Sequence, residues 1–308
     1  MRAFVIGFLL FCAFALVARW FYVCEVRGLC APEPEPQTRP LTLALMQGDS
    51  AVADEFQQFA FAKNDPQPIL TENNRVFLQT VLAWMKAFPG WHLRITGRQL
   101  AGEMDRPVGM YDYLAIARAA AVRDSLVAMG ADADRMDLDF EFLPDSIGLR
   151  EPLAFHAVRA DSSHVHVPFT FEDMTFTDRH FVSGGELFRP APSFFRYADS
   201  LVQWQAGRKG VALQVVAHAD PQALPPHVNQ PPADDEALYS YTHEFGLRRA
   251  RQVAHFLYDY ALELPVGIES PGHRQPMTSP DDPLQRLKNR RIELRLVSAD
   301  SVSVESAQ

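Results

Sequence analysis

Residues Val211–Asp220 read VALQVVAHAD, and residues Phe245–Leu257 read FGLRRARQVAHFL. The first run is short and rich in Val and Leu, which predicts a buried strand, and an acid, Asp220, stands at its end. The second run repeats apolar residues at helical spacing and carries Arg249 among them. A carboxylate at a strand end and a guanidinium on a helix can together bind a ligand that has both an amine and a carboxylate.

The chain contains this pattern twice. Segments Trp84–Leu100 and Trp204–Asp220 align without a gap, 120 positions apart. Farther along, LAIARAAAVRDSL (114–126) matches FGLRRARQVAHFL 131 positions later, which pairs Arg118 with Arg249. The larger second offset means that the second copy has 11 more residues between its strand and its helix. Two repeats of this length predict tandem domains rather than a solenoid.

Each copy predicts the order strand, helix, strand, helix, strand, an α+β fold in which helices cover a mixed β-sheet. The run Phe59-Ala60-Phe61 resembles Phe169-Thr170-Phe171, and each run lies in the first strand expected for its copy. The elements expected in the first copy are strands at 55–62 and 91–96, a helix at 71–88 capped by Thr71, and a helix at 111–129 closed by Gly130. Those expected in the second copy are strands at 169–176, from 211 and at 291–297, with helices at 193–205 and 245–257.

The N-terminal run Ala3–Val23 is apolar except for Arg19, and about 20 such residues cross a bilayer as a helix. A cleaved signal peptide ending near Ala13-Phe14-Ala15 is the alternative, but the apolar run continues beyond that point. The run contains no Asp or Glu, which disfavours a proton-driven motor. The expected segments are a transmembrane anchor (1–30), a stiff Pro/Glu linker (31–48), two domains (49–162 and 163–298) and a flexible tail (299–308).

Composition excludes several classes of function. The net charge of −9 argues against nucleic acid or anionic lipid as the main partner. Cys24 and Cys30 form either a small disulfide or two reduced thiols. No GxSxG, HExxH or phosphate-binding Gly-rich loop is present, so we predict neither an enzyme nor a cofactor. His164 and His166 form an HxH pair, but no neighbour along the chain completes a metal site, so we expect none.

Three motifs of the second copy resemble the C-terminal, peptidoglycan-binding domain of the OmpA-like family. The family's strand end Gly-His-Thr-Asp appears as Ala217–Asp220, and its helix motif Leu-Ser-x-x-Arg-Ala-x-x-Val appears at residues 245–253. The family's Asn-Arg-Arg before the last strand is intact as Asn289, Arg290 and Arg291. The resemblance covers residues 50–298, and three motifs in order at plausible spacing make it specific.

The resemblance implies that the second domain binds peptidoglycan noncovalently, through the diaminopimelate residue of the peptide stem. Asp220 would pair with the ligand ammonium, and Arg249 would hold a carboxylate in its planar fork. Two departures from the family pattern, Ala217 for Gly and Gly246 for Ser, leave fine specificity open. The resemblance does not say whether Arg290 or Arg291 faces the pocket. The other residues expected at this pocket are Asn289, Arg290, Arg291, His218 and Thr242, the last standing where the family usually has Asn.

The first copy departs further from the family, because Leu100 stands at the position of Asp220 and no Asn-Arg-Arg follows. We expect it to serve as a spacer, a dimerisation surface or a docking surface for other envelope proteins. The whole chain is then expected to be a membrane-anchored protein of the cell envelope with both domains in the periplasm. The alternative is a non-catalytic scaffold of an envelope complex in which neither pocket binds peptidoglycan and Asp220 and Arg249 point apart.

Overall fold

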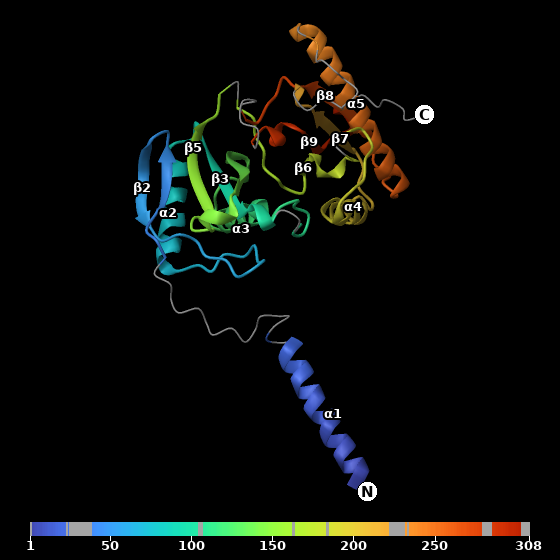
Figure 1. Ribbon diagram of the computed structural model, residues 1–308. Coiled ribbons are helices and arrows are strands. Elements are labelled where there is room, and N and C mark those ends of the chain that lie inside the picture. Colours follow the sequence, from blue (N-terminus) through green and yellow to red (C-terminus); the bar gives the residue numbers. More distant parts are fainter. Residues whose placement is uncertain are drawn as a thin grey trace. The chain divides into compact units, whose positions relative to one another are not determined.

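The structure is a computed structural model of the chain, which forms two compact units, Met1–Arg39 and Pro40–Gln308 (Figure 1). It describes residues 2–22, 24, 39–103, 107–161, 164–182, 185–221, 232, 234–278 and 285–302. The predicted boundary between the copies at 162/163 lies outside the described residues. So do Cys30, residues 31–38 of the predicted linker and residues 303–308 of the predicted tail.

Within the described part of the first unit, one helix, α1 (Arg2–Phe21), carries largely exposed apolar side chains. No helix among the described residues is both long and apolar enough to cross a membrane, so the expected transmembrane span is not found. Cys24 is disulfide-bonded, whereas Cys12 is a free thiol.

The second unit contains two mixed β-sheets with helices, which confirms the predicted α+β class. The first sheet has five strands in the order β2-β1-β5-β3-β4. Strand β3 runs parallel to β4 and antiparallel to β5, and β1 runs parallel to β5. The elements of this copy are β1 (Leu43–Gln47), β2 (Ser50–Phe56), α2 (Glu72–Ala87), β3 (Trp91–Leu100), α3 (Leu114–Ala128), β4 (Met136–Leu143) and β5 (Leu153–Arg159).

The second sheet has four strands in the order β6-β9-β7-β8. In this order β5, β3 and β4 of the first sheet take the places of β9, β7 and β8. The strands β1 and β6 also take the same place, but β1 runs parallel to β5 whereas β6 runs antiparallel to β9. At the 120-residue offset, β6 corresponds to residues 53–57, most of which belong to β2. The second copy is therefore β-α-β-α-β-β, one strand more than predicted, and the first copy has a further strand, β1, in front of the same series. The elements are β6 (Asp173–Thr177), α4 (Pro192–Trp204), β7 (Val211–His218), α5 (Asp235–Asp259), β8 (Val266–Gly272) and β9 (Arg291–Ser298).

The strand missing from the prediction is β4 in the first copy and β8 in the second. Strand β4 reads MDLDFEFL, and this alternation of apolar and acidic residues is a clear strand signal. Strand β8 reads VGIESPG, where Gly267 and Pro271 weaken the signal. Helix α5 begins ten residues earlier than predicted, because the Asp234 side chain accepts a hydrogen bond from the Ala237 N–H and caps it. The Thr71 cap of α2 is confirmed by the bond from Asn74 N–H to its hydroxyl.

The first strand of each copy lies elsewhere than predicted. In the first copy, residues 57–60 form a connection, and Phe59 reaches the core from it. In the second copy, Phe169 has a φ of 51°, which an extended strand excludes, so β6 begins only at Asp173. Apolar residues in these two segments are core residues, but they do not belong to strands.

The two connections match at the same offset as the strands that follow them. Phe61 forms an isolated bridge with Pro68, and Phe181 forms one with Phe188, 120 positions later. Residues 59–61 therefore correspond to residues 179–181, and their predicted match with residues 169–171 is wrong. The internal repeat thus extends from these connections to the last strand of each copy.

Both copies have a glycine where the second helix crosses the second strand of its copy. The glycine is on the strand in the first copy and on the helix in the second. A Cβ on Gly97 of β3 would lie 1.8 Å from the Ala115 carbonyl oxygen of α3. A Cβ on Gly246 of α5 would lie 2.8 Å from the Ala217 carbonyl oxygen of β7. Gly97 corresponds to Ala217 and Ala115 to Gly246 at the two sequence offsets. The departures Ala217 and Gly246 from the family pattern are therefore coupled by a backbone contact.

A buried aspartate joins the two copies. Asp112, which precedes α3, accepts hydrogen bonds from the N–H and hydroxyl of Thr177, both 2.8 Å, and from the Ser193 hydroxyl at 2.6 Å. His180 Nε2 lies 2.8 Å from the same carboxylate. Burial alone would raise the pKa of Asp112, but His180 and the three hydrogen bonds hold it below its usual range. An ionised carboxylate of the first copy is therefore enclosed by groups of the second.

Candidate functional site

Arg249 lies at the centre of the candidate site. It projects from α5 and is 1% exposed. Its Nη1 lies 2.7 Å from Asp178 Oδ1, and its Nε donates to the Gly185 carbonyl at 2.8 Å. The guanidinium also lies 4.4 and 4.6 Å from the ring centroids of Phe181 and Phe245. Burial lowers the pKa of Arg249 and Asp178 opposes that shift, so the paired guanidinium keeps its charge.

Arg290 belongs to the same cluster. Its Nη2 lies 2.5 Å from Asp178 Oδ2, so two guanidinium groups share one carboxylate. The three groups together carry one positive charge in excess. Since the Arg290 side chain is 18% exposed, this charge is accessible from solvent, whereas Arg249 is enclosed. Of Arg290 and Arg291, it is therefore Arg290 that joins the cluster around Arg249.

The sequence interpretation missed Asp178, which follows directly after β6. The same signal that singled out Asp220, an acid just beyond an apolar strand, is present in its sequence context MTFTD. The first copy has Gln58 at this position, at the 120-residue offset, and Gln58 is buried and donates to the Thr42 hydroxyl. An acid between two arginines is thus a feature of the second copy.

The first copy keeps the arginine and its aromatic partner. Arg118 lies 5.1 Å from the ring centroid of Phe61, as Arg249 lies over Phe181. Its Nη1 donates to the Arg98 carbonyl at 3.3 Å and is 3.9 Å from Glu103. The first copy therefore keeps an arginine at the position of Arg249 but has neither acid of the second copy.

Asp220 lies two residues beyond the end of β7 and is 2% exposed. Its neighbour Ala219 donates from its N–H to the Gly272 carbonyl at 3.0 Å, which holds this strand end against the end of β8. The pairing of Asp220 with a ligand ammonium, opposite Arg249, stays a prediction.

Asn289 and Thr242 have internal partners. Asn289 Oδ1 accepts the N–H groups of Met277 and Thr278 at 2.8 and 3.1 Å, and Nδ2 donates to the Thr278 carbonyl at 3.0 Å. These bonds hold the chain after β8 beside Arg290. The Thr242 hydroxyl lies 2.9 Å from His273 Nδ1, which ties α5 to the residue after β8. Both residues therefore support the site's framework, and ligand contact by either one stays a prediction.

His218 and Arg291 form a separate network around Glu293 of β9. Arg291 Nε donates to Glu293 Oε1 at 2.7 Å, and His218 Nε2 lies 3.1 Å from the same oxygen. All three side chains are buried. Arg291 pairs with Glu293, whereas Arg290 meets Asp178. The predicted site residues are therefore divided between two clusters.

This second network predicts a loss of stability in acid. Burial lowers the pKa of His218 below its ordinary value of 6.5 and outweighs the adjacent Glu293. Below that pH the unfolded chain binds a proton that the folded chain does not, so the free energy of unfolding falls as pH falls through about 6.5. Burial alone would raise the pKa of Glu293, but His218, Arg291 and Arg295 hold it far below its usual range, which adds a further loss below about pH 4.5.

Urea unfolding between pH 7.5 and pH 5.5 measures the first of these losses. The variant His218→Gln is expected to flatten the pH dependence in this range, because it removes the proton uptake. The variant His255→Gln, which changes an exposed histidine of α5, is the matched control and should keep the wild-type slope. An unchanged slope in His218→Gln would contradict the assignment.

Comparison with known proteins gives limited likenesses. No protein-family model matches the chain, and no curated protein matches it. The periplasmic domain of Helicobacter pylori MotB is 18% identical over 41% of this chain and 74% of that chain, with a TM-score of 0.32. A putative MotB-like protein from Desulfovibrio vulgaris gives the same four values. The cell wall anchor of the T6SS from Pseudomonas aeruginosa is 21% identical over 41% and 80%, with a TM-score of 0.30. Such low TM-scores carry no functional argument, so function is inferred from the chain's own residues.

Proposed function

We propose that the second copy binds peptidoglycan noncovalently, through a stem peptide that contains diaminopimelate. The observation that carries this function is the cluster of Arg249, Asp178 and Arg290, in which two guanidinium groups share one carboxylate. A ligand carboxylate that reaches Arg290 would neutralise the excess positive charge and accept hydrogen bonds from its planar fork. Asp220 would then receive the ligand ammonium.

In this scheme Arg249 forms the rigid floor of the proposed binding site. Its guanidinium is held by Asp178, by the Gly185 carbonyl and by two aromatic rings, so it has little freedom to lose on binding. Arg290, at the solvent side of the cluster, makes the first contact with the ligand. No bond is made or broken, and the protein holds the cell wall from the periplasmic side. This function does not require a membrane span.

The first copy has a supporting role. It keeps Arg118 but has Gln58 and Leu100 at the positions of Asp178 and Asp220. A pocket with neither acid should bind diaminopimelate weakly, because the ligand ammonium would have no carboxylate partner. We infer that this copy positions the second one and offers its outer surface to other envelope proteins.

Co-sedimentation of the full-length protein with purified diaminopimelate-type sacculi tests this function. Arg290→Gln is expected to weaken binding tenfold or more, because a hydrogen bond to a charged group contributes roughly 1.5–3 kcal/mol. Asp220→Asn is expected to act similarly through the ammonium. Arg208→Gln removes the same charge from a different place in the second copy, where Arg208 lies over Trp204, and should bind as the wild type does.

Lysine-type sacculi supply the second arm, because lysine differs from diaminopimelate by the missing carboxylate. Weaker binding to these sacculi would agree with carboxylate recognition by Arg290. Equal binding to both types would contradict it.

The scaffold function is the second candidate, and one observation favours it. Arg249 already has an internal carboxylate partner in Asp178, so the cluster is partly neutralised without a ligand. Under this alternative the wild type does not sediment with sacculi, or Arg290→Gln and Arg208→Gln sediment equally. Either outcome would replace the wall-binding function by an interaction role.

A further inference from the structure

Three histidines and one aspartate converge where the two copies are joined. His92 comes from β3 and Asp137 from β4, while His164 and His166 come from the segment between β5 and β6. One ligand atom from each lies within 4.8 Å of all the others. His166 Nδ1 is 2.6 Å from Asp137 Oδ1, His164 Nε2 is 3.0 Å from Asp137 Oδ2, and His92 Nδ1 is 3.8 Å from the same Oδ2.

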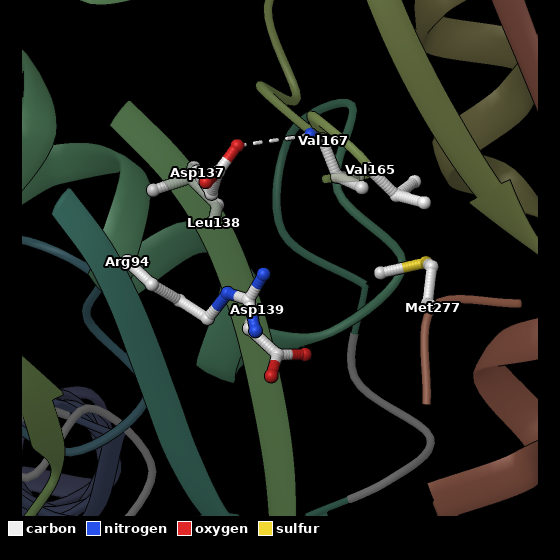
Figure 2. Close-up of a pocket in the computed structure, with 7 residues that line it drawn as sticks. All are labelled: Arg94, Asp137, Leu138, Asp139, Val165, Val167 and Met277. Atoms are coloured by element: carbon white, nitrogen blue, oxygen red, sulfur yellow. Dashed lines mark hydrogen bonds between the residues drawn. The ribbon is translucent and has the colours of Figure 1, made fainter. Parts of the chain in front are cut away.

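The strand geometry explains why these residues meet. His92 and Arg94 alternate along β3 with the core residue Leu93, so they lie on the sheet face opposite the core. Arg94 pairs with Asp137 across the parallel strands, which places Asp137 on the same face. Figure 2 shows the segment at Val167 crossing beside β4, where the Val167 N–H donates to Asp137 Oδ1 at 3.3 Å. This crossing brings the HxH pair over the sheet.

The converging atoms are unsatisfied. Among the described residues, His92 Nδ1, His164 Nε2 and Asp137 Oδ2 are buried and have no hydrogen-bond partner. His164 Nε2 and Asp137 Oδ2 are close, but not in hydrogen-bond geometry. The Asp137 and His164 side chains are 2% and 7% exposed, so these atoms lie away from bulk solvent. Three buried nitrogen and oxygen atoms that lie within 4.8 Å of one another and lack hydrogen-bond partners in the described part of the chain are a suitable donor set for a cation.

We propose that His92, Asp137, His164 and His166 bind one divalent transition-metal ion of the zinc class. Three imidazoles and a carboxylate are a nitrogen-rich set that zinc prefers, and four protein ligands leave no open position, which is typical of a structural site. A tetrahedral ion about 2.0–2.1 Å from each ligand holds the ligand atoms about 3.4 Å apart. Small side-chain movements bring the present cluster to this spacing: the two pairs at 2.6 and 3.0 Å separate slightly, and the more distant atoms approach.

The ion has a route to this site. His164 and His166 line a cleft of about 540 Å³, whose other walls come from the second copy, including Asp173 and Glu293. The His166 side chain is 31% exposed and forms the solvent side of the cluster. Binding would fasten residues 164–166 to β3 and β4 and so fix the connection between the copies. This revises the sequence expectation of no metal, because His92 and Asp137 are distant in sequence from the HxH pair.

The test uses the full-length protein freed of metal by a chelator and then titrated with Zn²⁺. We expect one Zn²⁺ per chain, a rise in Tm on binding, and a tetrahedral visible spectrum when Co²⁺ replaces Zn²⁺. His166→Gln removes the most exposed ligand, so the fold should persist while the affinity for Zn²⁺ falls at least tenfold. His255→Gln, on the exposed face of α5, is the matched control and should bind as the wild type does.

Two results would overturn the site. Equal Zn²⁺ affinity in the wild type and in His166→Gln would mean that the ion binds elsewhere. An octahedral Co²⁺ spectrum, or no Zn²⁺ bound by the folded wild type, would leave the cluster as a plain ion pair between Asp137 and His166. Circular dichroism of each protein before titration separates loss of the site from loss of the fold, and the wild-type spectrum decides the question without any variant.

Discussion

Replacing Asp112 by alanine is expected to reduce the free energy of unfolding by about 3–5 kcal/mol, because the change leaves a buried ionic network without its central acceptor. His180 would lose its carboxylate, and the Ser193 hydroxyl and Thr177 N–H would lose their acceptor in a dry environment. All these partners belong to the second copy. The substitution should therefore weaken the junction between the copies rather than one sheet alone.

Urea unfolding of the wild type, Asp112→Ala and Asp134→Ala measures this effect. Asp134 is exposed in the turn before β4, so its substitution should change stability by less than about 0.5 kcal/mol. Asp112→Asn keeps the size and one acceptor oxygen, and we expect an intermediate loss. If Asp112→Ala unfolds at the same urea concentration as Asp134→Ala, the aspartate does not hold the copies together.

The second large effect is expected at Gly97, where a methyl group would meet a backbone oxygen. A Cβ there lies 1.8 Å from the Ala115 carbonyl oxygen, so β3 and α3 must separate. Overpacking of this kind costs about 3 kcal/mol. Gly246→Ala should cost less, because its backbone contact, with the Ala217 carbonyl oxygen, is 2.8 Å, and its nearer contact, at 2.1 Å, is with the Ser270 side chain rather than with the backbone.

Gly90→Ala is the matched control, since a Cβ at Gly90 meets nothing within 4 Å. Thermal and urea unfolding should rank the three variants with Gly97→Ala least stable and Gly90→Ala close to the wild type. A Gly97→Ala protein as stable as Gly90→Ala would show that the helix–strand crossing is looser than these contacts imply.

The sequence was informative where the signal is local. Thr71 as a helix cap and the runs that became β3, β7 and β9 follow from spacing and composition over a few residues. The alternation in β4 was also local, although the prediction passed over it. Phe169 misled the prediction because its apolar side chain enters the core from a backbone with positive φ.

The candidate site was predictable only in part, because its contacts are long-range. Motifs identified Arg249, Arg290 and Arg291. The choice of Arg290 over Arg291 requires knowing that β9 starts at Arg291 and that Arg290 meets Asp178. Asp112 contacts residues 65 to 81 positions away. His92, Asp137 and the HxH pair likewise lie on separate elements, and nothing in each one's own neighbourhood indicates the other partners.

The exchange of glycine between strand and helix means that the two copies are not interchangeable modules. If α3 were transplanted against β7, the methyl group of Ala115 would take the place that Gly246 leaves empty beside the Ala217 carbonyl. If β7 were transplanted against α3, the Ala217 methyl group would meet the Ala115 carbonyl. A chimaera must therefore exchange strand and helix together, because each glycine is matched to the backbone of its own partner.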